Sequence, residues 1–329
     1  MQARVACLSP YSEVTVRAMF AGRHRVEVVL VPPPPAQAEV AAACASADLV
    51  IADRRHKHQI DRGILQQMKR CLLIQQAAVG FDSIDHRAAA EHGIPVANAA
   101  GYNKESVADW TVMAMIALLR RSFWLHGQLR SGHWHAADPL RGVETMGHEL
   151  GAMTVGIIGM GNIGSAVARR VAAFGSRIIF ADPIPRTVAN SVQVDLDTVL
   201  QESDIVCLHA PLDVDTKALV GEEALARMKR GSYLINAARG AIVDETALIN
   251  ALRSGHLAGA GLDVFEVEPL AADSPLRSLD TVVLAPHRAG ATLEADARLI
   301  EVIGENLIRV LDGKTPLHVV NDVIAARLR

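Results

Sequence analysis

The sequence predicts an α/β protein built from two doubly wound parallel sheets, and three observations support this fold class. The chain has 329 residues, more than one hydrophobic core usually supports, so two domains are expected. Half of the residues are hydrophobic and only 4% are aromatic, a composition typical of buried parallel strands covered by helices. Short apolar runs alternate with helical stretches in two separate series, as they do in βαβ units.

The first series fills the N-terminal hundred residues. Its five apolar runs predict strands at residues 4–9, 25–31, 47–52, 71–79 and 94–100. The pattern changes at residue 103, where an apolar stretch predicts a long buried helix that starts with a capping-box-like Ser106-x-x-Asp109. The polar segment after it, 122–150, shows no strong periodicity, so we expect a loop or an arm that packs against another subunit.

The second series runs from residue 153 to residue 285. Its apolar runs predict strands at 153–159, 177–182, 203–211, 231–238, 258–265 and 280–286, with helical segments between most of them. Residues 292–314 then predict a final amphipathic helix. Each series therefore predicts its own parallel sheet.

The overall charge argues against nucleic acid or a membrane surface as a partner. The formal net charge is −3, so no basic surface is expected. The start of the chain has no charged leader followed by an apolar stretch, and no run reaches the roughly 18 apolar residues that a membrane span requires. We expect a cytoplasmic protein.

The four cysteines are scattered without CxxC spacing, so we expect neither disulfides nor a metal site.

A glycine-rich turn indicates a dinucleotide site. Gly159, Gly161 and Gly164 follow the G-x-G-x-x-G order between a predicted strand and a predicted helix, and Asp182 ends the next strand, 23 residues after Gly159. Gly159 permits the tight turn, Gly161 lets the backbone approach a pyrophosphate, and Gly164 lets helix and strand pack closely. A carboxylate at position 182 favours NAD over NADP, because it would repel a 2′-phosphate. Arg186, nearby, leaves NADP open.

Three polar side chains follow later strands and are candidates for the chemistry. Arg239, Glu268 and His287 each come after a predicted strand, and ligands bind at the carboxyl ends of strands in open α/β sheets. Together they supply a cation for a carboxylate and a carbonyl oxygen, a proton donor, and an acid that orients that donor. These are the parts that reduction of a 2-keto acid needs.

Ordered motifs along most of the chain resemble the D-isomer-specific 2-hydroxyacid dehydrogenase family. The matching stretches are QQAAVGFDSID, GIPVANAAGYNKESVADW, RSGHW, VGIIGMGNIG, HAPL, LINAARGAIVDETAL, GAGLDVFEVEP and LAPHRAGAT. Several motifs in the right order are far more specific than the glycine turn alone.

The resemblance implies a role for each candidate residue. His287 would be the general acid in reduction and the base in oxidation, and Glu268 would hydrogen-bond to it and favour its charged form. Arg239 would bind the substrate carboxylate and polarise the C2 oxygen, while the backbone N–H groups of Val79 and Gly80 hold that carboxylate from the other domain.

The cofactor would lie along the glycine turn and the strand ends. Asp263 would bind the carboxamide of the nicotinamide. The remaining residues expected to contact the cofactor are Met160, Asn162, Ile163, His209, Ala210, Pro211 and Ala237.

The resemblance also implies the domain organisation. A flavodoxin-like substrate domain would be discontinuous, formed by residues 1–101 and 290–329, and a Rossmann NAD-binding domain would span 102–289, with a cleft between the two. Hinge closure would exclude water from this cleft. The segment after residue 121 suggests a homodimer.

The expected substrate is a small 2-keto acid such as glyoxylate, hydroxypyruvate or pyruvate, interconverted with its D-2-hydroxy acid. Arg54 and Arg55 lie in a loop that either recognises a second anionic group or is simply solvated, and Arg288 could add positive charge beside the histidine. The alternative from another class is an NAD(H)-sensing binding protein, since some relatives with this fold act as corepressors.

Overall fold

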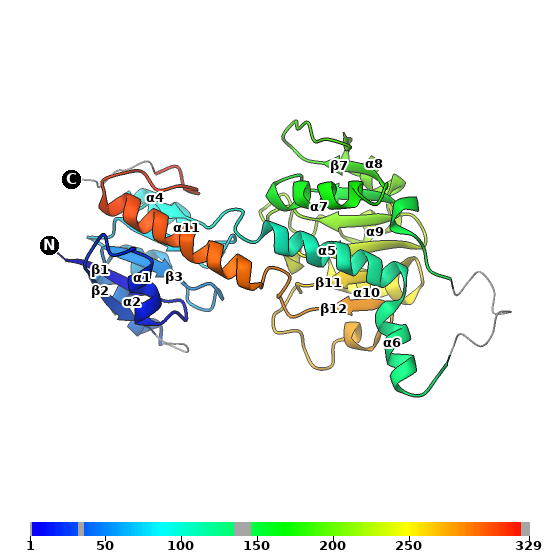
Figure 1. The fold of residues 1–329 in the computed structure, drawn as a ribbon, viewed down its shortest axis with the longest axis horizontal. Coiled ribbons are helices and arrows are strands. Elements are labelled where there is room, and N and C mark those ends of the chain that lie inside the picture. The colour runs from blue at the N-terminus through cyan, green and yellow to red at the C-terminus, as the bar shows by residue number, and fades with distance from the viewer. Residues whose placement is uncertain (1, 32–35, 135–145, 324–329) are drawn as a thin grey trace. The chain divides into compact units, whose positions relative to one another are not determined.

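The computed structural model describes residues 2–31, 36–134 and 146–323 of the chain. The chain divides into two compact units (Figure 1). Unit 1 consists of Met1–Asn103 together with Thr292–Arg329, and unit 2 consists of Lys104–Ala291. In the described part of the chain, no helix is long and apolar enough to cross a membrane.

Unit 1 is a five-stranded parallel sheet covered by helices on both faces. The strand order is β2-β1-β3-β4-β5, and the apolar residues of the central strands are buried on both sides, as expected for a parallel sheet. The strands are β1 (Ala3–Cys7), β2 (Val26–Leu30), β3 (Leu49–Ala52), β4 (Leu73–Gln76) and β5 (Val96–Ala97). The helices are α1 (Glu13–Ala18), α2 (Gln37–Ser46), α3 (Arg62–Leu65), α4 (His86–Glu91) and α11 (Leu293–Leu311).

The C-terminal helix α11 completes unit 1. It begins at Thr292, whose side chain accepts a hydrogen bond from the N–H of Ala295. Leu299, Ile303 and Leu307 form one buried stripe that packs with α1 against the sheet, while α2, α3 and α4 cover the other face. Residues from the two ends of the chain therefore share one core.

Unit 2 is a seven-stranded parallel sheet with the order β12-β11-β10-β9-β6-β7-β8. The order reverses between β6 and β9, which is the switch point where a doubly wound sheet binds its ligand. The strands are β6 (Thr154–Ile158), β7 (Arg177–Ala181), β8 (Val192–Gln193), β9 (Ile205–Leu208), β10 (Ser232–Asn236), β11 (Leu257–Leu262) and β12 (Val282–Leu284). The helices are α5 (Lys104–Leu119), α6 (Ser122–Arg130), α7 (Asn162–Ala172), α8 (Leu196–Glu202), α9 (Glu222–Arg227) and α10 (Glu245–Arg253), with short 3-10 turns η3 (Leu150–Ala152), η4 (Gly240–Ile242) and η5 (Pro275–Ser278).

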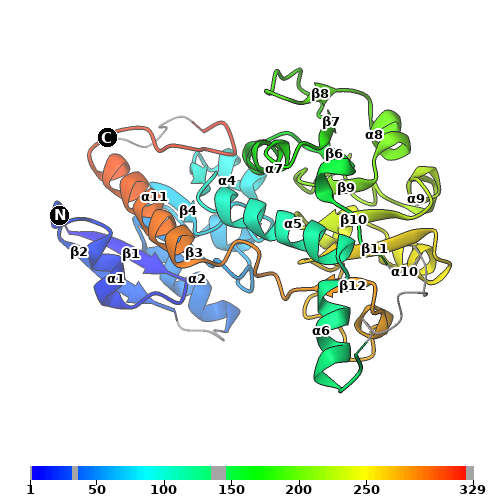
Figure 2. The same cartoon turned by 45° about the vertical axis from the view of Figure 1, so that its right-hand side comes forward.

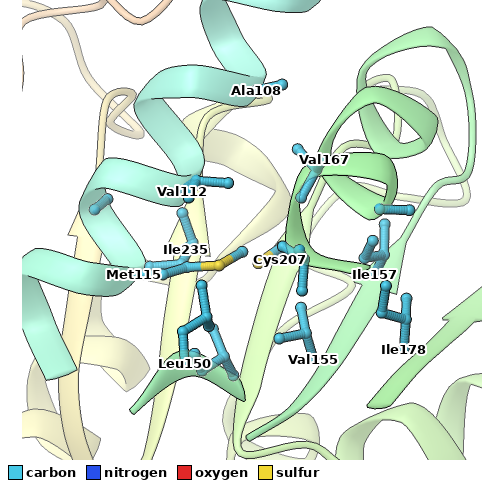
Figure 3. Close-up of a cluster of buried hydrophobic side chains, with 14 of the residues drawn as sticks. Ala108, Val112, Met115, Leu150, Val155, Ile157, Val167, Ile178, Cys207 and Ile235 are labelled. Atoms are coloured by element: carbon cyan, nitrogen blue, oxygen red, sulfur yellow. The ribbon is translucent and has the colours of Figure 1, made fainter. Parts of the chain in front are cut away.

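Two hydrophobic clusters, one on each face, pack helices against the sheet of unit 2. Helices α5 and α7 cover one face, where Met115 and Val167 meet side chains of β6, β9 and β10 such as Cys207 (Figure 3). Helices α8, α9 and α10 cover the other face. Because helices cover both faces, the carboxyl ends of the strands are left to the loops, and these loops carry the candidate site.

The predicted fold class is confirmed, with local corrections. Residues 122–130 form helix α6, so the prediction of a loop was wrong there. The helix is hard to recognise because none of its nine residues, all of which the structure describes, is buried. In both views it extends from the end of α5 away from the sheet (Figures 1 and 2).

The predicted capping box was also wrong, since α5 already begins at Lys104 and Ser106 lies inside it. The short strand β8 was not predicted, and residues 135–145 of the predicted arm lie outside the described residues.

Candidate active site

The glycine turn lies at the switch point of the seven-stranded sheet. Gly159 directly follows β6 and has a φ of +93°, and a Cβ there would lie 2.6 Å from the amide nitrogen of Ala210, which follows β9. Only glycine meets both demands, the left-handed backbone and the close approach. Helix α7 begins three residues after Gly159, at Asn162 with Gly161 as its cap, so its first N–H groups are available to an anion.

A cavity of about 390 Å³ lies at this helix start. Its cationic residues belong to different elements of unit 2, and together with the helix N-terminus they make it suited to a phosphorylated ligand. The residues of the glycine turn and this cavity therefore fit the pyrophosphate of a dinucleotide. The lining residues are Lys104, Met160, Gly161, Asn162, Ser165, Ala166, Arg169 and Arg186.

Asp182, at the end of β7, lies beside the same turn. Its carboxylate accepts hydrogen bonds from the N–H groups of Met160 at 2.8 Å and Ile184 at 2.9 Å, and Arg186 lies 3.1 Å away. Burial opposes the charge of this carboxyl, but the two N–H groups and the guanidinium outweigh it and hold the pKa of Asp182 below its usual value. The side chain is thus a charged acceptor next to the glycine turn.

His209 lies directly after β9, on the other side of the switch point. Its two ring nitrogens are buried and have no hydrogen-bond partner in the part of the chain that the structure describes. Burial lowers the pKa of His209 from 6.5 to about 4, so the ring is neutral at physiological pH. Ala210 and Pro211 continue the loop, and Ala237 lies at the corresponding place after the neighbouring strand β10.

Arg239 is held in place by the loop that follows β10. The side chain of Asn236 accepts a hydrogen bond from the N–H of Ala238 at 3.0 Å and donates one to the carbonyl of Arg239 at 2.9 Å. A Cβ on Gly240 would lie 1.9 Å from the carbonyl carbon of Phe265. The absence of a side chain at position 240 therefore lets the arginine loop pack directly on the loop after β11.

Glu268 and His287 form a hydrogen-bonded pair. Nδ1 of His287 lies 2.9 Å from Oε2 of Glu268, and the other carboxylate oxygen of Glu268 accepts the N–H of Phe265 at 3.2 Å. Burial opposes the charge of Glu268, but His287, the N–H of Phe265 and nearby Arg239 together lower the pKa of this carboxyl. With Nδ1 engaged, Nε2 of His287 is the nitrogen left to exchange a proton with a substrate.

Asp263 is buried and directly follows β11. Its carboxylate accepts hydrogen bonds from the N–H groups of Arg288 at 2.6 Å and Ala289 at 2.8 Å. Burial raises the pKa of Asp263 to about 6, against the opposite effect of these two N–H groups and of His287. The residue therefore contacts the backbone of the histidine loop.

The structure brings the three chemical candidates together on neighbouring strands. Arg239, Glu268 and His287 follow β10, β11 and β12, which lie side by side at one edge of the sheet in unit 2. Val79 and Gly80 belong to unit 1, where they follow β4, and the carbonyl of Val79 accepts a hydrogen bond from the Asn98 side chain at 2.7 Å.

The structure separates the three arginines whose role the sequence left open. Arg54 is not simply solvated, because its guanidinium is 2.7 Å from Asp296 and lies over the ring of Tyr11, whereas Arg55 is exposed. Arg288 is exposed as well.

Sequence reasoning missed two residues that build the site. Asn236 and Gly240 flank the arginine, and the signal was present as a polar residue ending an apolar strand and a glycine directly after the candidate cation. Within the described ranges, no group of three or more His, Cys, Asp or Glu side chains is placed to hold a metal ion.

Comparison with known proteins identifies the family. The model of the family described as D-isomer specific 2-hydroxyacid dehydrogenase, NAD binding domain, matches residues 112–289. The chain is 42% identical over 270 residues to a glyoxylate reductase of Korarchaeum cryptofilum, covering 80% of each chain. It is 40% identical over 253 residues to a hydroxypyruvate reductase of Thermotoga maritima, covering 76% of this chain and 81% of the relative.

A solved structure has a similar fold over nearly the whole chain. The TT0316 protein from Thermus thermophilus has a TM-score of 0.84 and 36% identity, covering 96% of this chain and 99% of that one. The chain therefore belongs to the D-isomer-specific 2-hydroxyacid dehydrogenase family and is an NAD(P)-dependent oxidoreductase that interconverts 2-keto acids and D-2-hydroxy acids.

Proposed function

We propose that this protein is an NADH-dependent reductase of small 2-keto acids, with glyoxylate and hydroxypyruvate as the first candidates. The observation that carries the proposal is the Glu268–His287 hydrogen bond. The two residues follow β11 and β12, and Arg239 follows the neighbouring strand β10 of the sheet whose strand β6 leads into the glycine turn. The activities named for the two relatives, a glyoxylate reductase and a hydroxypyruvate reductase, support the choice of substrates.

In this proposal Arg239, His287 and Glu268 have different roles in the reaction. Arg239 binds the substrate carboxylate and stabilises the negative charge that develops on the C2 oxygen. His287 donates the proton from Nε2 to that oxygen, and Glu268 orients the ring through Nδ1 and stabilises its charged form. The reduced nicotinamide, when bound, supplies the hydride that C2 receives. In the oxidation of a hydroxy acid, His287 takes the proton back.

Unit 1 is the proposed substrate-binding domain, and the N–H groups of Val79 and Gly80 would hold the carboxylate. Unit 2 would bind the cofactor through the glycine turn, His209 to Pro211 and Ala237. The proposed preference is for NADH, because the carboxylate of Asp182 beside the turn would repel a 2′-phosphate.

We also propose a homodimer formed through α6. The helix presents large apolar side chains to solvent, with Phe123 57% exposed and Leu129 56% exposed. Exposed apolar side chains grouped on one helix are typical of a surface that another chain covers. A helix that buries no residue of its own, among nine that are described, is explained if a second copy covers it.

The decisive experiment follows NADH absorbance with purified protein and a panel of 2-keto acids. His287→Gln should lower turnover by about 100-fold or more, since it removes the proton donor while keeping a polar side chain. The exposed His148→Gln is the matched control and should leave turnover unchanged. If no acid is reduced although NADH binds, the proposal fails and an NADH-sensing role takes its place.

A further inference from the structure

Three consecutive backbone N–H groups of the histidine loop donate to one residue. The N–H of His287 is bonded to the main-chain carbonyl of Asp263 at 2.7 Å. Those of Arg288 and Ala289 are bonded to the two oxygens of its carboxylate at 2.6 and 2.8 Å. Asp263 is 2% exposed, so these bonds form away from water. The residue thus binds the backbone on which His287 is carried.

The backbone at His287 needs such support. Its φ is +55°, in the left-handed region that residues other than glycine adopt only at a cost of about 1–2 kcal/mol. This conformation accompanies the 2.9 Å contact between the imidazole and Glu268. Without the three bonds from residues 287–289, the loop is free to relax to a right-handed or extended backbone, and the ring would turn away from its carboxylate partner.

Only an aspartate carboxylate suits this arrangement. Each of its two oxygens receives one N–H, so both must be acceptors. An asparagine amide offers one acceptor, and its NH₂ group would face the second N–H. A glutamate carries one more methylene and would displace the loop. The charge also strengthens both bonds relative to neutral acceptors.

We infer that Asp263 is a positioning residue, which fixes the backbone of residues 287–289 and thereby the imidazole of His287. This inference rests on the proposed function of His287. It differs from the expectation that Asp263 serves mainly to bind the carboxamide of the cofactor, because here both carboxylate oxygens bind the histidine loop. The two roles make different predictions about cofactor affinity and turnover.

The first test is Asp263→Asn. The dissociation constant of NADH is measured by fluorescence titration without substrate, and kcat is measured at saturating NADH. A positioning role predicts that kcat falls by about 30- to 100-fold, the value of one or two hydrogen bonds to a charged acceptor. NADH affinity should change by less than threefold, and the pH dependence of kcat should shift, because the contact between His287 and Glu268 is loosened.

The matched control is Asp195→Asn. Asp195 also accepts a backbone N–H, that of Thr198 at 2.7 Å, but at the start of α8. It should leave kcat, its pH dependence and NADH affinity unchanged. A rise of more than tenfold in the dissociation constant of NADH for Asp263→Asn, with kcat unchanged, overturns the inference and makes Asp263 a cofactor anchor.

A second measurement uses the unmodified protein, so it does not depend on whether a variant folds. Hydrogen exchange followed by NMR or by mass spectrometry of short peptides should show slow exchange for the amides of Arg288 and Ala289, although Arg288 itself is exposed. Exchange at the rate of an unprotected loop would overturn the inference. Loss of the proposed function is recognised separately, as the absence of 2-keto acid reduction by the unmodified protein.

Discussion

Glu268 accepts a hydrogen bond from Nδ1 of His287 at 2.9 Å, although 19 residues separate the two in the sequence. The contact engages Nδ1, so Nε2 is the nitrogen that would meet a substrate in the proposed function. Most of the chemistry proposed for this protein depends on that contact.

Glu268→Gln tests the charge in this pair. The amide can still hydrogen-bond to the ring but no longer stabilises its charged form, so kcat/KM for keto acid reduction should fall by about 10- to 100-fold. Steady-state kinetics with a 2-keto acid measure the effect. Glu222→Gln, at an exposed position in the first turn of α9, serves as control. An equal kcat/KM for Glu268→Gln and the unmodified protein would refute the role of the charge.

Gly240→Ala tests how the arginine loop is seated. The new Cβ would lie 1.9 Å from the backbone of Phe265, so the loop must shift. We expect a loss of about 3 kcal/mol in the free energy of unfolding and a raised KM for the keto acid, because Arg239 moves with its neighbour. Gly221→Ala is the control, since its nearest atom is 3.5 Å away. Equal melting temperatures for the two variants would contradict the prediction.

Burial of His209 predicts acid sensitivity. Its pKa is lowered to about 4 in the folded protein from 6.5, so between these values the unfolded chain binds a proton that the folded chain does not. Stability then rises with pH through this window and is lost as pH falls from 6.5 to 4, by up to about 3 kcal/mol. Denaturant unfolding at pH 7.5 and 5 should show a smaller acid loss for His209→Leu than for the unmodified protein or for exposed His148→Leu. An identical loss in all three excludes this source.

Asp182→Asn tests the choice of cofactor. Removing the carboxylate removes the repulsion of a 2′-phosphate and releases Arg186, 3.1 Å away, to bind it. The ratio of kcat/KM for NADPH to that for NADH should rise by about 100-fold. The double variant Asp182→Asn with Arg186→Gln should lose most of this gain. A ratio that stays constant across all variants would show that position 182 does not select the cofactor.

Leu129→Glu tests the proposed dimer. A charge on the apolar surface of α6 should raise the dimer dissociation constant by about 100-fold or more, because the carboxylate would have to be buried in the interface. Sedimentation velocity at micromolar concentrations measures the effect. Val214→Glu, at a site that is 87% exposed, is the control and should leave association unchanged. An unmodified protein that sediments only as a monomer would exclude the dimer.

Much of the fold could be read from the sequence because its signals are local. Apolar runs mark the strands of both sheets, and the glycine turn, Asp182 and the polar residues after β10, β11 and β12 were identified from their neighbours in the chain. In a parallel sheet these strand ends must meet at one edge, so a local pattern already specifies which side chains gather there. The helix α6 escaped this reasoning, because it buries no residue that would create a periodic pattern.

Other features depended on contacts between distant parts of the chain. Whether Arg54 is solvated or paired was decided by Asp296, 242 residues away, which α11 brings to the same unit. The hydrogen bonds that Asp263 accepts from Arg288 and Ala289 likewise span 25 and 26 residues. No sequence pattern around Asp263 predicts these hydrogen bonds. The sequence by itself determined which elements form and which side chains lie at strand ends, since these follow from periodicity and backbone preference. Tertiary structure alone decided the partners of Arg54 and Asp263, because these partners come from segments that only folding brings together.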